Sequence, residues 1–257
     1  ARLPESVQAI ANYSVGYDHV DIEAAKARGL IVTNTPEVLS DATAELTMML
    51  MLGAARRASE GERLVRTREW KDWSPSFMVG TQVTGKRLGI LGFGRVGRVV
   101  AQRARGFNMQ IHYNDRQRIP PELEEGAIYH KTPEQLMPHC DFLTLHTVAS
   151  PETNKLLNAD LIALLPDGAI VVNASRGTVI DDNALIAALK SGKLTAAGLD
   201  VYNDEPNIHP EYRRLSNVFL MPHIGSATKE TRDAMGFRAI DNLDAIFAGK
   251  EPRDRVA

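Results

Sequence analysis

Three charged side chains follow strand-like segments of this sequence, at the points where the apolar residues stop. Arg176 follows "AIVVNAS", Glu205 follows "TAAGLDVYND" and His223 follows "NVFLMP". Ligands of open α/β sheets bind beyond the carboxyl ends of the strands, so we expect the three residues at one site. Taken alone, Arg176 is better explained as a loop charge, Glu205 as a solvated turn residue and His223 as a core histidine. Their convergence favours a catalytic role.

Together these residue types suit the reduction of a 2-keto acid. A guanidinium binds a carboxylate through two parallel hydrogen bonds and can polarise the neighbouring carbonyl. A protonated histidine can give its proton to the oxygen that develops negative charge, and a nearby glutamate favours the protonated form. The hydride must come from a cofactor. We therefore predict that Arg176 binds the substrate, that His223 is the acid/base and that Glu205 is its partner.

The spacing of three glycines predicts a dinucleotide site. "LGILGFGRVGRVVA" places Gly92, Gly94 and Gly97 in the pattern G-x-G-x-x-G, after a strand and at the start of a helix. The first glycine permits a tight turn, the second permits close approach of a pyrophosphate, and the third lets the helix pack on the strand. The helix N-terminus directs N–H groups at the phosphates. The pattern alone is a weak signal, and the strand and helix around it strengthen it.

The residues after the next strand bear on which nicotinamide cofactor binds. Asp115 lies 18 residues after Gly97, where an acidic side chain would hydrogen-bond the adenosine ribose and favour NAD. Its alternative is an ordinary turn residue. Arg116 and Arg118 follow directly and could hold the 2′-phosphate of NADP. The sequence slightly favours NAD and leaves NADP open.

The elements that would position these residues alternate along the chain from residue 87 onward. Apolar strands separated by helices indicate a parallel sheet that is covered on both faces, hence a doubly wound α/β fold of the Rossmann type. A buried helix is expected over residues 40–57, and a helix over 228–250 should end at Gly249. Residues 8–36 read as part of a second α/β unit. Strands are predicted at 87–93, 109–115, 141–147, 169–174, 195–201 and 217–222.

The composition argues against several classes of partner. Thirty Lys and Arg against 32 Asp and Glu give a net charge of −2, which disfavours nucleic acid or an anionic membrane surface as the partner. The single cysteine, Cys140, excludes an internal disulfide and suits the cytoplasm. No run of 18 apolar residues occurs, and we expect neither a membrane span nor a metal site. The start at Ala1, without methionine or signal-peptide anatomy, is expected to be cut rather than natural.

Four motifs carry a resemblance to a known family. "LGFGRVG", "NASRGTVIDDNAL", "GLDVYNDEP" and "MPHIGSAT" occur in the order and spacing of the D-isomer-specific 2-hydroxyacid dehydrogenases, over about residues 85–230. The chain most resembles the glyoxylate/hydroxypyruvate reductase branch. The resemblance implies NAD(P)H-dependent reduction of a short 2-keto acid to the D-2-hydroxy acid. Glu205 separates the chain from formate dehydrogenases, which share the fold and pair their histidine with glutamine.

The resemblance also implies roles for further residues. Backbone N–H groups of Val15 and Gly16 would hold the substrate carboxylate, and Gly225 and Ser226 would close the pocket. Asp200 would meet the nicotinamide carboxamide. Cofactor contacts are expected at the three glycines, Asp115, Arg116, Asp200, His223 and Gly225. They are also expected at Arg95, Val96, Val148, Thr153 and Ala174.

The same resemblance implies a domain division and a homodimer. Residues 38–225 would form the dinucleotide-binding domain, and residues 1–37 and 226–257 would be remnants of an incomplete, flavodoxin-like substrate domain. Subunits would meet largely through a helix at 41–60, and Trp73 would enter the neighbouring subunit's substrate pocket or else be an ordinary packing aromatic.

The start of the chain differs from the family pattern. Some two or three strand–helix units precede the "SVGYDHVD" region in that family, and here only about a dozen residues do. This motivates an alternative function, an NADH-binding regulatory protein or a catalytically impaired fragment. The complete catalytic trio weighs against it.

Overall fold

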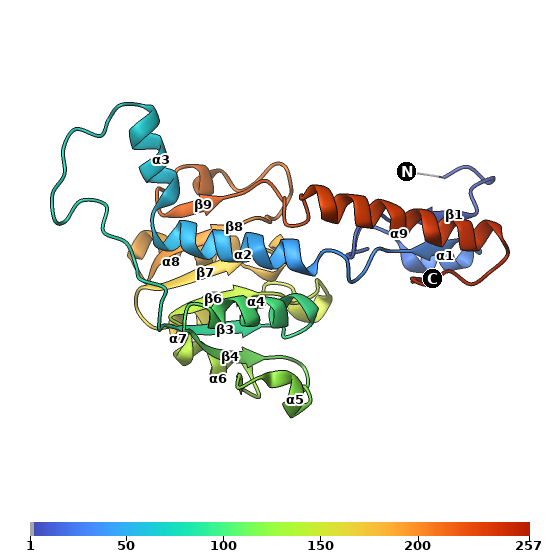
Figure 1. The fold of residues 1–257 in the computed structure, drawn as a ribbon, viewed down its shortest axis with the longest axis horizontal. Coiled ribbons are helices and arrows are strands. Elements are labelled where there is room, and N and C mark those ends of the chain that lie inside the picture. The colour runs from blue at the N-terminus through green and yellow to red at the C-terminus, as the bar shows by residue number, and fades with distance from the viewer. Residues whose placement is uncertain (1–2) are drawn as a thin grey trace. The chain divides into compact units, whose positions relative to one another are not determined.

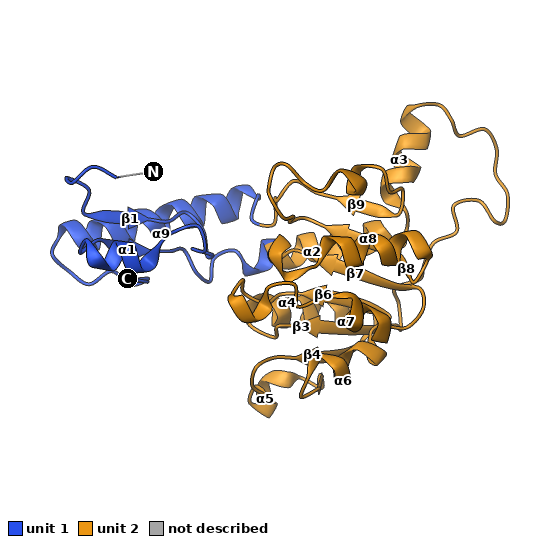
Figure 2. Cartoon of the chain, turned by 180° about the vertical axis from the view of Figure 1, so that it is seen from behind, with its two compact units in different colours: residues 1–42, 226–257 blue, residues 43–225 orange. Residues whose placement is uncertain are grey.

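The computed structural model describes residues 3–257, which form two compact units (Figure 2). Unit 2 comprises residues 43–225, and unit 1 comprises residues up to 42 together with 226–257. The sequence placed the first boundary at 37/38 and the second at 225/226. Residues 1 and 2, assigned to the first remnant, lie outside the described residues. The functional assignment of the two parts stays a prediction.

Unit 2 is built on a seven-stranded sheet whose order is β5-β4-β3-β6-β7-β8-β9 within residues 43–225 (Figure 1). All neighbouring strands are parallel. The order reverses between β3 and β6, as in dinucleotide-binding folds, so the predicted doubly wound α/β class is confirmed. The strands are β3 (Arg87–Leu91), β4 (Gln110–Asn114), β5 (Ile128–Tyr129), β6 (Phe142–Leu145), β7 (Ala169–Asn173), β8 (Leu194–Leu199) and β9 (Val218–Leu220).

Helices cover both faces of this sheet because alternate strand residues point to opposite sides. Leu88 and Ile90 of β3 lie in the core cluster that includes α2 and α4, and Leu91 lies in the cluster that includes α7 and α8. The helices are α2 (Ser40–Ala55), α3 (Ala58–Arg66), α4 (Arg95–Arg105), α5 (Pro121–Glu124), α6 (Pro133–Leu136), α7 (Ala159–Leu164) and α8 (Asp182–Ser191). Short 3-10 helices are η1 (Met137–His139), η2 (Pro151–Thr153), η3 (Gly177–Val179) and η4 (Pro210–Arg213).

Two sequence predictions about these elements are wrong. The helix expected to continue to residue 57, and the subunit-contact helix expected to continue to 60, end at Ala55. Arg57 takes a left-handed conformation (φ 55°) and α3 starts after it, with none of residues 58–66 buried. The apolar run stops where the two arginines begin, so nothing continues the buried face. The sequence also missed β5, which is only two residues long.

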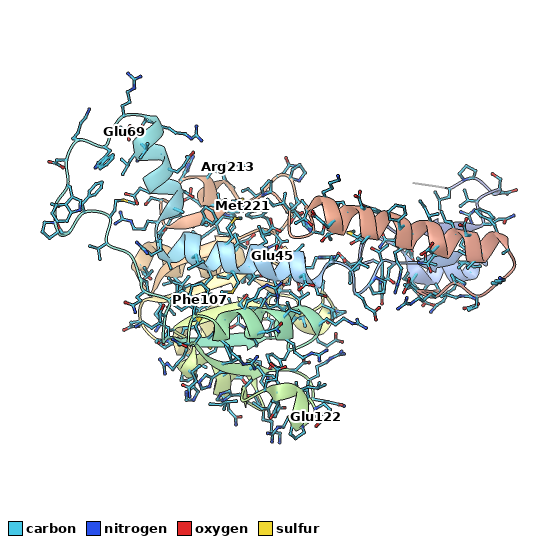
Figure 3. All side chains as sticks on the ribbon, in the orientation of Figure 1. Glu45, Glu69, Phe107, Glu122, Arg213 and Met221 are labelled. Atoms are coloured by element: carbon cyan, nitrogen blue, oxygen red, sulfur yellow. The ribbon has the colours of Figure 1, made fainter. Side chains whose placement is uncertain are left out.

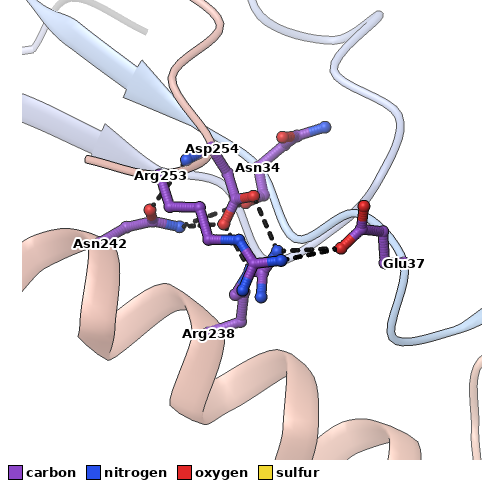
Figure 4. A network of polar contacts seen from close by, with 6 residues as sticks. All are labelled: Asn34, Glu37, Arg238, Asn242, Arg253 and Asp254. Atoms are coloured by element: carbon purple, nitrogen blue, oxygen red, sulfur yellow. Dashed lines mark hydrogen bonds and ion pairs between the residues drawn. The ribbon is translucent and has the colours of Figure 1, made fainter. Parts of the chain in front are cut away.

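Unit 1 contains a parallel pair of strands, β1 (Ala9–Ala11) and β2 (Ile31–Thr33), with helices α1 (Ile22–Ala27) and α9 (Lys229–Phe247). Helix α9 begins at the Thr228 cap and is followed by Gly249 at φ 68°, which confirms its predicted end. A polar network joins α9, the loop after β2 and the C-terminal segment (Figure 4). Its members are Asn34, Glu37, Arg238, Asn242, Arg253 and Asp254.

Three histidine rings pack together beside β4, the strand that leads to Asp115. His112 is 4% exposed, and its Nδ1 lies 2.9 Å from Nε2 of His130. Its ring also stacks on that of His139, with centroids 5.0 Å apart. Nε2 of His112 is buried without a hydrogen-bond partner among the described residues. Burial, and then the charges of the other two histidines, lower the pKa of His112 to about 4.

We predict that this histidine makes folding sensitive to mild acid. The unfolded chain takes up its proton near pH 6.5 and the folded chain only near 4, so the stability contributed by neutral His112 is full above pH 6.5 and is lost as pH falls toward 4. The free energy of unfolding should drop by roughly 1–2 kcal/mol between pH 7.5 and 5.5 from this group. Urea unfolding of the parent and of His112→Gln at both pH values tests this. Equal pH slopes in the two proteins would contradict it.

Candidate active site

The carboxyl ends of three neighbouring strands lie side by side in unit 2. Asn173, the last residue of β7, pairs with Leu199, the last residue of β8, which pairs with Leu220, the last residue of β9. The three predicted catalytic residues come three to six positions after these ends. The register therefore brings the segments that carry them to one edge of the sheet.

His223 and Glu205 form a close pair at this edge. Nδ1 of His223 lies 2.6 Å from Oε2 of Glu205. The other carboxylate oxygen, Oε1, accepts a hydrogen bond of 2.8 Å from the Tyr202 backbone N–H, so the carboxylate is oriented from both sides. Side-chain exposure of 47% for His223 and 32% for Glu205 leaves the pair accessible to a ligand. Since Nδ1 is engaged by Glu205, Nε2 is the ring nitrogen that can reach a substrate.

Asp200 holds the backbone of the segment that carries His223. Its carbonyl oxygen accepts from the His223 N–H at 2.8 Å, and its carboxylate accepts from the N–H groups of Ile224 at 2.8 Å and Gly225 at 2.9 Å. The side chain is 1% exposed, and this burial raises the pKa of Asp200. The sequence expected Asp200 at the nicotinamide carboxamide, which stays a prediction. The sequence did not predict that Asp200 holds the backbone of residues 223–225. The only signal for this role was an acidic residue directly after a buried strand.

A buried asparagine shapes the turn that presents Arg176. Oδ1 of Asn173 accepts from the N–H and the hydroxyl of Ser175, and its Nδ2 donates to the Arg176 carbonyl at 2.9 Å. The guanidinium donates to the Ser175 carbonyl at 2.9 Å. A Cβ on Gly177 would lie 1.9 Å from the carbonyl carbon of Tyr202. The Arg176 turn and the segment leading to Glu205 are therefore packed backbone to backbone.

The glycine loop after β3 has the shape that a dinucleotide requires. Gly92 has φ 89°, and a Cβ there would lie 2.7 Å from the His146 carbonyl carbon. A Cβ on Gly97 would lie 2.3 Å from the Gly92 carbonyl oxygen, so helix and turn are in contact. At Gly94, which precedes α4, a Cβ would meet no protein atom within 4 Å. Gly92 and Gly97 have no room for a side chain and support the fold. Gly94 faces the open space where a pyrophosphate would approach the helix N-terminus.

Asp115 follows β4 and faces the glycine loop. Its Oδ2 accepts from the Phe93 N–H at 2.7 Å, and its Oδ1 accepts from the Arg116 N–H at 2.7 Å. The carboxylate is thus fixed in place, and each oxygen keeps a lone pair for a ribose hydroxyl. The predicted ribose contact remains a prediction, as does a phosphate contact by the exposed Arg116.

The other predicted cofactor residues surround this loop. Arg95 and Val96 form the first turn of α4. Val148 follows β6 and is 68% exposed, and the Thr153 hydroxyl donates to the Val148 carbonyl at 2.6 Å. Ala174 is the first residue after β7 and is partly buried. All of these residues lie on segments that follow the carboxyl ends of strands, and therefore at the same edge of the sheet as Arg176.

The remaining predicted substrate residues belong to unit 1. Nδ2 of Asn12 donates to the Gly16 carbonyl at 2.9 Å, and Nδ2 of Asn34 donates to the Val15 carbonyl at 2.9 Å. These bonds orient the loop between β1 and α1. The predicted substrate contacts of this loop and of Ser226 stay predictions.

Trp73 is not positioned by the same strand ends. It is 74% exposed on the segment 67–82, which forms neither helix nor strand and leads into the amino end of β3. Figure 3 marks Glu69 near the beginning of this segment. The active-site segments lie beyond the carboxyl ends, so Trp73 does not join the site of its own chain. Its entry into a neighbouring subunit's pocket stays a prediction.

No group of three or more His, Cys, Asp or Glu side chains within residues 3–257 is arranged to hold a metal ion. In the same residues, no helix combines the length and apolar character needed to cross a membrane.

Comparison with known proteins finds close relatives. The family model "D-isomer specific 2-hydroxyacid dehydrogenase, NAD binding domain" matches residues 48–225. A glycerate dehydrogenase of Hyphomicrobium methylovorum is 45% identical over 97% of this chain and 78% of its own length. A glyoxylate reductase of Thermococcus litoralis is 46% identical over 96% and 76%. The structure of an NADPH-dependent glyoxylate/hydroxypyruvate reductase from Sinorhizobium meliloti, in complex with NADP and malonate, superposes with a TM-score of 0.89 at 34% identity, covering 98% of this chain and 78% of that one.

Proposed function

The chain belongs to the D-isomer-specific 2-hydroxyacid dehydrogenases, and from that premise we propose that it reduces a short 2-keto acid of the glyoxylate or hydroxypyruvate type to the D-2-hydroxy acid. The observation that carries the proposal is the pair of His223 and Glu205, 2.6 Å apart, at the strand edge where Arg176 emerges. Relatives that are glyoxylate reductases and a glycerate dehydrogenase support the substrate class.

His223 supplies the proton in this proposal. With a hydride supplied by the bound cofactor, the imidazolium would donate its Nε2 proton to the carbonyl oxygen, so that the carbonyl group becomes an alcohol and His223 becomes neutral. Glu205 binds Nδ1 and so orients the ring with Nε2 available to the substrate. In the reverse reaction the same atoms take the proton back. Neither residue needs to move, because both are fixed by backbone contacts at the strand ends.

Arg176 binds the substrate in this proposal. Its guanidinium pairs with the carboxylate and polarises the adjacent carbonyl, which makes the carbonyl carbon a better hydride acceptor. Amide N–H groups of Val15 and Gly16 would complete the carboxylate site. Ser226 would close it.

A nicotinamide dinucleotide supplies the hydride when bound. The glycine loop, the first turn of α4 and Val148 would hold it, and we propose that NADH is preferred to NADPH. The support is Asp115, whose carboxylate suits two ribose hydroxyls and repels a 2′-phosphate. The similar reductase from Sinorhizobium meliloti is NADPH-dependent and its structure contains NADP, so the preference needs a direct test.

A homodimer in the cytoplasm completes the proposal. Apolar side chains on the segment 67–82 support the dimer, since Trp70 is 56% and Trp73 74% exposed. The single cysteine, Cys140, can form no internal disulfide, which suits a reducing compartment.

Steady-state oxidation of NADH and, separately, NADPH with glyoxylate and hydroxypyruvate tests the function. We expect oxidation that depends on the keto acid, with a higher kcat/KM for NADH. Tight NADH binding without turnover on either acid would instead favour a regulatory protein that senses the dinucleotide. A higher kcat/KM for NADPH would overturn only the cofactor preference.

A further inference from the structure

An ion pair between the exposed Arg118 and the buried Glu124 lies in the segment that follows β4, with side-chain exposures of 56% and 8%. Glu124 ends helix α5 (Figure 1) and is 6% exposed. Its Oε1 accepts from Nε of Arg118 at 2.7 Å, and its Oε2 accepts from Nη2 at 2.8 Å. This is the bidentate geometry in which an arginine binds a carboxylate most strongly. Glu125, next in the chain, has φ 47°, and the turn it makes directs the chain from α5 toward β5.

The same carboxylate is connected to the cofactor loop. Oε1 of Glu124 accepts a hydrogen bond of 2.6 Å from the hydroxyl of Tyr113, a buried residue of β4. The Tyr113 ring stacks on Phe93, with centroids 4.1 Å apart and an angle of 22°. Phe93 lies in the glycine loop, and its N–H is the donor to Asp115. Glu124 therefore belongs to the set of contacts that orients the acidic residue expected at the ribose.

The charges after β4 give this pair a consequence for cofactor choice. A 2′-phosphate carries close to two negative charges, so Asp115 repels it, whereas Arg116 and Arg118 would attract it. Glu124 engages the Nε and Nη2 edge of Arg118, the edge with which an arginine would otherwise grip a phosphate. It also neutralises the charge of that guanidinium. Of the two candidate phosphate ligands, only Arg116 then keeps its full attraction for the 2′-phosphate.

We propose that Glu124 is a positioning residue for cofactor selectivity, which disfavours NADPH by holding Arg118 away from the 2′-phosphate position. The proposal rests on the proposed function, because it concerns the dinucleotide site of that enzyme. It adds a residue outside the glycine pattern and the ribose position to the determinants of cofactor choice.

The pair persists at every pH at which such an enzyme would be assayed. Hydrogen bonds from Arg118, and then from Tyr113, lower the pKa of Glu124 to about 2. The carboxylate is therefore ionised from weakly acidic to alkaline pH. Arg118 is held by a permanent charge, and its restraint does not switch with pH.

Equilibrium titration of the purified chain with NADH and with NADPH, followed by nicotinamide fluorescence, tests the proposal without requiring turnover. We expect Glu124→Gln to lower the Kd for NADPH relative to that for NADH by about 5–10-fold, because a released arginine gains a charge-assisted contact to the phosphate. The double variant Glu124→Gln/Arg118→Gln should return the ratio to within about 2-fold of the parent, if the gain acts through Arg118.

A matched control exists one residue away. Glu125 accepts from Nη1 of Arg105 at 2.8 Å, in an exposed ion pair at the far end of α4 from the glycine loop. Glu125→Gln removes the same charge in the same turn and should leave the ratio of the two Kd values within about 2-fold of the parent.

A second pair of variants does not depend on the stability of Glu124→Gln. In the parent background, Arg116→Gln should raise the Kd for NADPH about 5–10-fold, as expected for loss of a charged contact to phosphate. Arg118→Gln should change it by less than about 2-fold, because Arg118 makes no phosphate contact while Glu124 holds it. A rise of similar size in both variants would overturn the proposal.

The outcomes separate the explanations. An unchanged Kd ratio in Glu124→Gln, with NADH bound normally, would overturn the proposal and leave the proposed function intact. Equal weakening of both cofactors would mean that Glu124 only supports the packing of Tyr113 on Phe93, which also overturns it. A parent chain that binds neither dinucleotide would overturn the proposed function, and this inference with it.

Discussion

Replacement of His223 by alanine should lower keto-acid reduction by about 10²–10⁴-fold in kcat, the usual cost of losing a positioned acid/base. The same loss is expected for the reverse oxidation, since one group handles the proton in both directions. Binding of NADH, measured by fluorescence titration, should weaken far less than turnover. If both directions stayed within a few-fold of the parent, His223 would not be the acid/base and the assignment of the site would be abandoned.

A double-mutant cycle with Glu205 sharpens this test. Glu205 touches the same imidazole at 2.6 Å, so the two side chains should act as a unit. Glu205→Gln alone should cost about 10–100-fold, less than loss of the histidine. Added to His223→Ala it should cost little more, because the group that it supports is already absent. Fully multiplicative losses would mean that Glu205 acts elsewhere.

Replacement of Arg176 by glutamine should lower kcat/KM for glyoxylate by about 10²–10³-fold. Loss of carboxylate binding should appear as a higher KM, and loss of carbonyl polarisation as a lower kcat. Arg176→Lys keeps the charge without the planar fork, so it should recover only part of the loss. Steady-state kinetics of both variants over a wide range of keto-acid concentration provide the measurement.

Arg213 offers a matched control for this prediction. It is an exposed arginine of η4, marked in Figure 3, and Arg213→Gln makes the same change of charge without touching the strand ends that carry the site. Its kcat/KM should stay within about 2-fold of the parent. A similar loss in both variants would indicate an effect of net charge on substrate attraction, and Arg176 would have no specific role.

The fold was predictable where local patterns set it. Runs of β-branched and aliphatic residues marked six of the strands in unit 2, because a strand that is buried on both faces must be apolar throughout. Gly249 marked the end of α9, because a glycine adopts the left-handed backbone that follows the last turn. The break between α2 and α3 was not predictable, since a left-handed arginine at position 57 has no local signature. Strand β5 was too short to leave a pattern.

The chemistry of the site was determined by the sequence itself. Only a few residue types can bind a carboxylate, carry a proton or approach a pyrophosphate, and their positions after strands indicated one edge of a sheet. Arg176, Glu205, His223 and the three glycines could therefore be named without a structure. The pairing of Glu205 with His223 followed from the same chemistry and from the resemblance to a family, but its geometry, 2.6 Å through Nδ1, is given only by the structure.

Tertiary structure alone decided what holds these residues in place. Asp200 binds backbone N–H groups 24 and 25 positions away, Gly177 contacts Tyr202, and Glu124 pairs with Arg118. Such contacts join segments whose spacing along the chain carries no periodic signal. They form only after the strands have paired in register, because pairing is what brings their loops to a common edge. Sequence thus determined the reacting groups, and the paired sheet determined their neighbours.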